Sequence, residues 1–105
     1  MSVYRYMVVH APKVDHKEAV EKARAVIHAF VKNREHLIVD EQREDEDLTK
    51  FSVQDTSELN VGCIIVYRNS VMFTLMGEVA EKDSWSMEID AVDLMEEAFP
   101  ESRLQ

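Results

Sequence analysis

VGCIIVYRNSVMFTLMGEV, residues 61–79, is the stretch of this chain that decides its fold. Both halves are rich in the β-branched and aromatic residues that are typical of strands. We expect one strand over 61–68 and a second over 71–79, joined by a two-residue turn at Asn69 and Ser70. Asn tolerates the left-handed backbone conformation that such a turn needs. The segment therefore predicts a β-hairpin.

Both faces of this predicted hairpin are apolar, because successive side chains of a strand point to opposite sides. The expected cross-strand pairs are Tyr67 with Met72, Val66 with Phe73, and Ile64 with Leu75. A shift of one residue in the turn would change these pairs but keep both faces. The core face consists of Ile64, Val66, Val71, Phe73 and Leu75. The second face consists of Val61, Cys63, Ile65, Tyr67, Met72, Thr74 and Met76.

Upstream of the hairpin, the chain predicts a strand over 3–9 and, after Pro12, a long amphipathic helix. Asp15 followed by Glu18 resembles a capping box at the start of that helix. Its apolar stripe consists of Ala19, Val20, Ala23, Val26, Ile27, Phe30 and Val31. The basic outer side of the helix carries Lys17, Lys22, Arg24, His28 and Lys32. This spacing predicts a helix that packs one face on a sheet.

Three further segments complete the prediction. We expect strands over 37–42 and 48–54, joined by the charged connection 43–47. Residues 84–90 alternate polar and apolar side chains, which favours a strand followed by a short helix over 91–99. One longer helix that begins at Ser84 is the alternative.

The element order β-α-β-β-β-β-β-α predicts a two-layer α+β sandwich. Strands mostly follow strands, so the sheet of about five to six strands should be largely antiparallel. The long N-terminal helix packs across one face, and the short C-terminal helix covers the same face or part of the other. The 105 residues, of which 46% are apolar and 31% charged, suit a single domain over 1–105.

No residue pattern in the chain predicts catalysis, a cofactor or a metal. Gly62 and Gly77 lie in strands, where close backbone approach is the simplest explanation for a glycine, and no nucleotide-binding motif surrounds them. The histidines His10, His16, His28 and His36 lack metal-ligand spacing. Cys63, the single cysteine, rules out an intramolecular disulfide and is expected to be a buried small hydrophobe. We therefore expect a protein that is not an enzyme.

The charge of the chain is unevenly divided. Residues 1–36 carry seven Lys or Arg against four acids, whereas residues 37–105 carry five against seventeen, which gives the net charge of −9. Such a field attracts basic partners and repels nucleic acids and anionic membranes. The longest apolar run is too short for a membrane-spanning helix, and no signal-peptide pattern opens the chain. The expected location is the cytoplasm.

These features favour a small, acidic, non-enzymatic protein-binding module of the inhibitor, immunity or charge-mimic type, acting on a basic partner. The alternative for the acidic run around 40–47 is a solvated hairpin tip, since it lacks the pattern of a calcium-binding loop. The expected partner-binding residues are Asp40, Glu41, Glu44, Asp45, Glu46, Asp47, Trp85, Glu88, Asp93, Glu96 and Glu97.

The second hairpin face supports an alternative function. Unless the C-terminal helix covers this face, it is an exposed apolar surface of the kind that marks an interface. In a homodimeric structural or regulatory domain, two copies could pack sheet against sheet and bury this surface without a different protein. The expected dimer face consists of Cys63, Ile65, Tyr67, Met72 and Met76.

Overall fold

The computed structural model describes residues 3–10, 12–32, 34, 36–76 and 81–100. Five strands and two helices are found in these ranges. The elements are β1 (Val3–His10), α1 (His16–Val31), β2 (Ile38–Asp45), β3 (Leu48–Gln54), β4 (Asn60–Val66), β5 (Ser70–Met76) and α2 (Glu81–Ala98).

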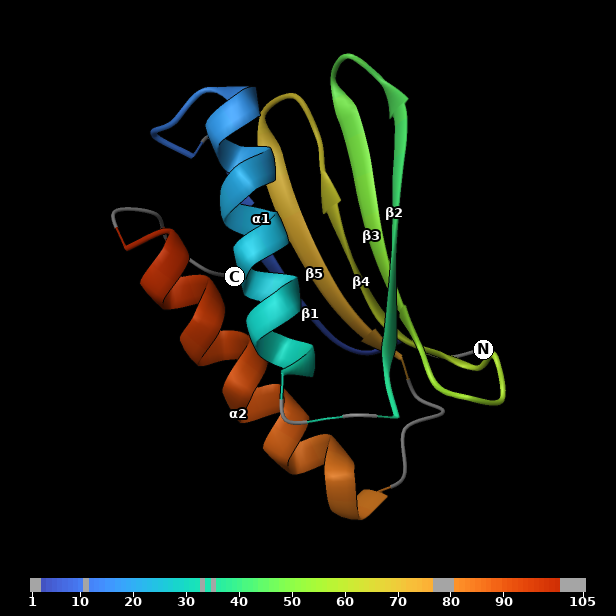
Figure 1. Cartoon of the computed structure of the whole chain (residues 1–105). Coiled ribbons are helices and arrows are strands. Elements are labelled where there is room, and N and C mark those ends of the chain that lie inside the picture. The colour runs from blue at the N-terminus through green and yellow to red at the C-terminus, as the bar shows by residue number, and fades with distance from the viewer. Residues whose placement is uncertain (1–2, 11, 33, 35, 77–80, 101–105) are drawn as a thin grey trace.

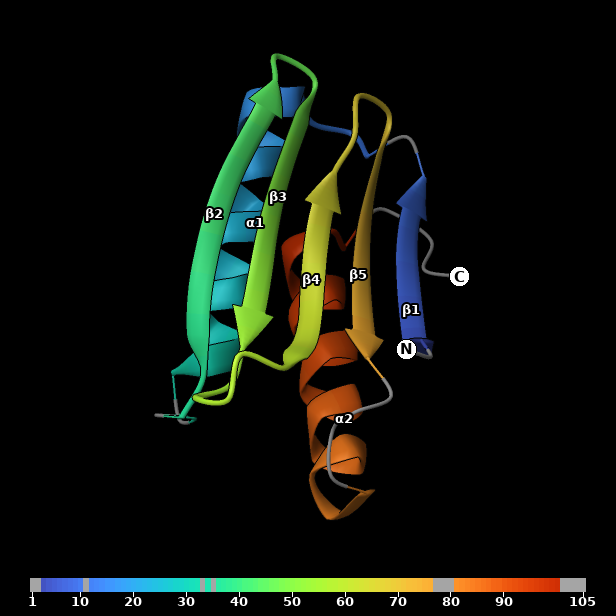
Figure 2. The ribbon, with the colours of Figure 1, turned by 90° about the vertical axis from the view of Figure 1, so that its right-hand side faces the viewer.

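The five strands form one antiparallel sheet in the order β1-β5-β4-β3-β2. The strands β2 to β5 follow one another as a meander, and β1 joins the far side of β5. Helix α1 therefore carries the chain from one edge of the sheet to the other, and both helices lie on the same face (Figures 1 and 2). The predicted α+β fold with a mainly antiparallel sheet is confirmed.

Helix α1 begins and packs as the sequence predicts. The side chain of Asp15 is the N-cap and accepts a hydrogen bond from the backbone N–H of Glu18 at 2.8 Å. This bond satisfies one of the amide donors that a helix start leaves unpaired. The buried residues are Ala19, Ala23, Val26, Ile27 and Phe30, all from the predicted stripe.

The predicted two faces of the β4–β5 hairpin are confirmed except at Val61, which lies at an irregularity in the β3–β4 pairing and belongs to the buried core cluster. The turn lies one residue earlier than predicted. Val66 pairs with Val71 and Ile64 with Phe73, which leaves Arg68 and Asn69 as the turn. The predicted left-handed Asn69 is wrong, because the only non-glycine residue with positive φ among those described is Glu58. The core face is nevertheless the predicted one. Its members Ile64, Val66, Val71, Phe73 and Leu75 are at most 1% exposed.

Gly62 lies where β4 and β5 approach each other closely. A Cβ atom at this position would lie 2.6 Å from the backbone oxygen of Thr74 and 3.3 Å from Cδ2 of Leu75. Only glycine fits such a spacing without a backbone shift, so the predicted close approach is confirmed. Gly77 lies outside the described residues.

The hydrophobic core lies between the sheet and the two helices. Phe30 of α1 meets Phe73 of β5 edge to face, with ring centroids 5.3 Å apart. Met87, Ala91 and Met95 of α2 belong to the same buried cluster. One core therefore holds both helices on one side of the sheet and leaves the other side, here called the open face, without a described helix over it.

Residues 84–90 belong to α2, so the predicted strand there is wrong and the longer helix is correct. Their alternating pattern fits a strand, but Met87, Ala91 and Met95 recur every four residues and all become buried. That spacing places them on one helix face, toward the core shared with α1. The C-terminal helix thus spans 18 residues and is not short.

Strand β2 is longer than predicted. Residues 43–45, expected in the connection, continue the strand and leave Glu46 and Asp47 as the turn. The turn is held by Asp45, whose carboxylate accepts a hydrogen bond from the backbone N–H of Asp47 at 2.7 Å. Most of the acidic run therefore lies along a strand at the edge of the sheet and not in a loop.

Candidate functional site

The acids expected to form one partner-binding surface lie in two places. Asp40, Glu41, Glu44 and the residues up to 47 belong to β2 and its turn. Glu88, Asp93, Glu96 and Glu97 belong to α2. Helix α1 lies between these two groups (Figure 1), so they do not form one continuous patch. Trp85 belongs to α2 as well, but its side chain lies outside the described residues.

The acids of α2 are partly neutralised by the rest of the fold. Arg34 donates a hydrogen bond to Asp90 at 2.6 Å and lies over the Phe30 ring at 4.8 Å, which ties α2 to the end of α1. At the C-terminal end of α2, Lys13, Glu18 and Lys22 line a hollow of about 160 Å³ together with Ala98 and Phe99. Cations near the C-terminus of a helix offset both its dipole and its acids.

The acids of β2 and its turn are all exposed, whereas Glu88 and Asp90 of α2 are half-buried. From residue 40 to residue 47 every side chain is exposed, and this stretch carries six acids against the single Arg43. Within the part of the chain that the structure describes, the one ion pair made by these acids joins Glu41 to Arg24. The remaining acids of this stretch therefore keep their charge facing the solvent; they are Asp40, Glu44, Asp45, Glu46 and Asp47.

The pair between Arg24 and Glu41 connects α1 to the edge of the sheet. Arg24 donates from Nε and Nη2 to the two carboxylate oxygens of Glu41, at 2.9 and 3.1 Å. Hydrogen bonding to Arg24 lowers the pKa of Glu41, so this carboxylate stays ionised at neutral pH. Both side chains are 41% exposed, and such solvated pairs contribute little to stability.

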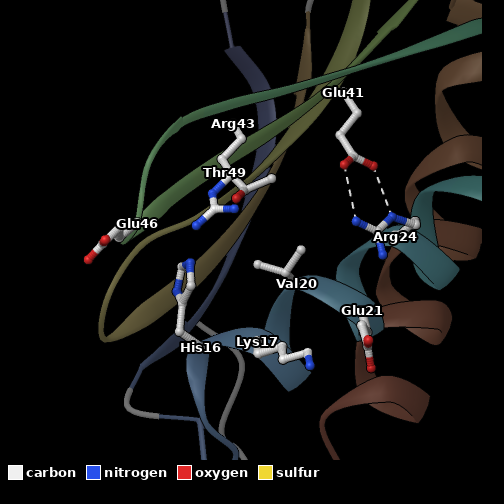
Figure 3. A pocket seen from close by; sticks show the side chains of 9 residues that line it. All are labelled: His16, Lys17, Val20, Glu21, Arg24, Glu41, Arg43, Glu46 and Thr49. Atoms are coloured by element: carbon white, nitrogen blue, oxygen red, sulfur yellow. Dashed lines mark hydrogen bonds and ion pairs between the residues drawn. The ribbon is translucent and has the colours of Figure 1, made fainter.

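A groove of about 530 Å³ runs between α1 and β2 (Figure 3). The Arg24–Glu41 pair crosses one end of it, and Figure 3 shows His16 and Arg43 pointing toward each other farther along. Val20 and the buried Thr49 supply an apolar part of its lining. The complete set of lining residues is His16, Lys17, Val20, Glu21, Arg24, Glu41, Arg43, Glu46 and Thr49.

This groove was not among the features predicted from the sequence. Its walls come from α1 and from β2, which are adjacent only because α1 crosses the sheet to the edge where β2 lies. The signal that could have found it is the opposite charge of the two segments, a basic helix side and an acidic strand. Charge alone does not specify which of several acidic segments faces the helix.

The open face of the sheet carries the expected dimer residues. Val8, Met72 and Ile65 form a cross-strand row over β1, β5 and β4, which continues with Lys50 on β3. Met76 is half-buried, Cys63 is 7% exposed, and Tyr67 at the end of β4 is 39% exposed. The apolar side chains thus lie over three neighbouring strands, and the polar ones lie toward β2. The interpretation that α2 covers this face is wrong.

The structure describes the surroundings of three histidines and of the single cysteine. His16 lies at the start of α1 with Nδ1 3.2 Å from the backbone oxygen of Tyr67, while His28 and His36 are exposed elsewhere. Burial raises the pKa of the Cys63 thiol, with only partial opposition from the charge of Lys50, and this disfavours the reactive thiolate. Among the described residues no group of three or more His, Cys, Asp or Glu could hold a metal ion.

Comparisons with protein-family models, with curated proteins and with solved structures found no match to this chain. Within the described ranges, neither helix is both long and apolar enough to cross a membrane. The surfaces of the described residues are therefore the basis for a functional proposal.

Proposed function

We propose that this chain is a non-enzymatic protein-binding module that recognises a basic partner through the β2–β3 hairpin. The observation that carries the proposal is the exposure of the acids of residues 40–47, which lack a described cationic partner apart from Glu41. Unpaired charges of one sign on a protruding hairpin speed the encounter with an opposite charge. The acids of α2 are a weaker candidate, because Asp90 is paired with Arg34 and both Glu88 and Asp90 are half-buried.

Charge reversal at the hairpin tests this proposal. The variant Glu44→Lys/Glu46→Lys/Asp47→Lys removes three exposed acids and spares Asp45, whose carboxylate holds the turn. We expect it to lose the binding of a basic partner captured from a cell lysate at low salt, with association slowed by about tenfold or more. Capture followed by surface plasmon resonance measures this effect.

A variant with the same net charge provides the control. Asp93→Lys/Glu96→Lys/Glu97→Lys also replaces three exposed acids, so each variant changes the net charge by +6, from −9 to −3. We expect the α2 variant to retain the partner. Equal losses in both variants would show that overall charge matters and not the hairpin, and a loss confined to the α2 variant would move the site to that helix.

The open face supports homodimerisation as a second candidate function. Both helices lie on the opposite side, so Val8, Ile65 and Met72 have no described helix over them. If the face pairs with a second copy, Ile65→Glu places two buried carboxylates at the interface and should convert a dimer to a monomer. Sedimentation velocity at high salt measures the change. A wild-type protein that is monomeric at high concentration would eliminate this candidate.

A further inference from the structure

Strand β2 is an open edge of the sheet. It pairs with β3 on one side, and no described strand pairs with it on the other. In an antiparallel pair every second residue directs its backbone N–H and C=O toward the neighbour, so the alternate residues of β2 direct theirs outward. An exposed edge of eight residues offers these groups to an incoming strand.

The groove described above runs beside this edge. Its walls are the first half of α1 and residues Glu41, Arg43 and Glu46 of β2 and its turn. A strand added to β2 would lie about 4.8 Å from it and would direct every second side chain to the helix side of the sheet. There the groove offers space, with Val20 as an apolar contact. An edge strand flanked by a helical groove is the arrangement used to bind extended peptides by strand addition.

The charge of β2 determines which strand fits. A second copy of β2 would bring four acids against four and would be repelled, as charged edges commonly are. A basic segment meets the opposite situation, because Asp40 on the open face and Glu46 and Asp47 at the turn make no ion pair among the described residues. The edge therefore selects a basic strand and rejects a copy of itself.

We propose that β2 binds a basic, extended segment of the partner as a sixth strand, with alternate side chains in the α1–β2 groove. This inference rests on the proposed function and specifies its geometry. Lys or Arg side chains on the open-face side lie beside Asp40. Small apolar side chains on the helix side enter the groove next to Val20.

A designed peptide tests the geometry directly. The probe is a synthetic peptide that alternates Lys and Val, with both ends capped, added at low salt to the isotope-labelled full chain. Amide hydrogen exchange followed by NMR measures the protection. When the peptide is bound, we expect the outward-facing amides of β2 to exchange at about a tenth of their free rate or below. The amides paired with β3 change little. A charge-matched control peptide carries an N-methyl group on every residue, which removes all backbone donors. We expect it to bind about tenfold more weakly, because several backbone hydrogen bonds are lost.

The outcomes separate this inference from the proposed function. If both peptides bind equally and β2 gains no protection, strand addition is overturned. The proposed function still stands in that case if the hairpin charge reversal abolishes the binding of both peptides. If the Lys–Val peptide binds the charge-reversed variant as tightly as the wild type, the proposed function fails. Protection that appears on β1, the other edge of the sheet, and not on β2 would also overturn the inference.

Discussion

Replacing Phe73 by Ala is expected to lower the free energy of unfolding by about 3–5 kcal/mol. Phe73 is fully buried on the core face of β5 and packs edge to face on Phe30 of α1. The substitution removes a large apolar surface and leaves a cavity between the sheet and the helix that the surrounding backbone cannot close. A domain of this size has a total stability of about 5–15 kcal/mol, so a large fraction is lost. Urea unfolding followed by circular dichroism measures the difference.

Met72 provides the matched control on the same strand. Its side chain points to the open face and is only half-buried, so Met72→Ala should cost about 1 kcal/mol or less. The contrast between neighbouring residues measures how differently the two faces of the sheet are covered. If Met72→Ala costs as much as Phe73→Ala, the open face is covered in solution. A dependence of that cost on protein concentration would identify a second copy as the cover.

Replacing Gly62 by Ala is expected to destabilise the protein by about 1–3 kcal/mol, although glycine is generally unfavourable in strands. Exchanging Gly for Ala in a strand gains about 0.5–1 kcal/mol where space exists. Here the new methyl group would lie 2.6 Å from the backbone oxygen of Thr74. The steric cost exceeds the entropic gain, because this neighbour is backbone in a paired strand and moves only if β4 and β5 separate. Thermal and urea unfolding of the variant measure the net effect.

A second variant distinguishes the backbone contact from the side-chain contact. The same methyl group would lie 3.3 Å from Cδ2 of Leu75, and Leu75→Val removes atoms at that point. We expect Gly62→Ala/Leu75→Val to be no more stable than Gly62→Ala alone, since the clash with the Thr74 oxygen persists. Recovery of stability in the double variant would contradict this explanation.

The position of the acids bears on how the protein avoids aggregation as well as on binding. A long, exposed edge strand is a site where sheets join unless charge prevents it. Six acids between residues 40 and 47 make the association of two such edges unfavourable while leaving the edge accessible to a basic strand. One feature can therefore protect the folded protein and select its partner.

Much of the fold could be predicted because local signals agree with the final packing. The stripe of α1 and its cap at Asp15 depend on spacing and on one local hydrogen bond. The two-sided β4–β5 hairpin depends on alternation, which tolerated the error of one residue in the turn. The exposed acids of β2 could be recognised as a candidate surface for the same reason, since a run of charge seldom becomes buried.

The remaining features depend on contacts between distant segments. Residues 84–90 fit a strand locally, and they are helical because Met87, Ala91 and Met95 pack into the core that α1 and the sheet share. Because β1 lies beside β5, helix α1 must cross the sheet to reach β2 at the other edge. This crossing brings α1 next to β2 and forms both the groove and the Arg24–Glu41 pair.

By itself, the sequence determined the α+β class, the apolar stripe of α1, the two faces of the hairpin and the division of charge. Each of these follows from side-chain spacing along one segment. Only the tertiary structure decided that both helices share one face, that one sheet face stays open, and that the acids line an edge beside a groove. Those features depend on which surfaces bury the most apolar area together, and that property belongs to pairs of segments and not to any one of them.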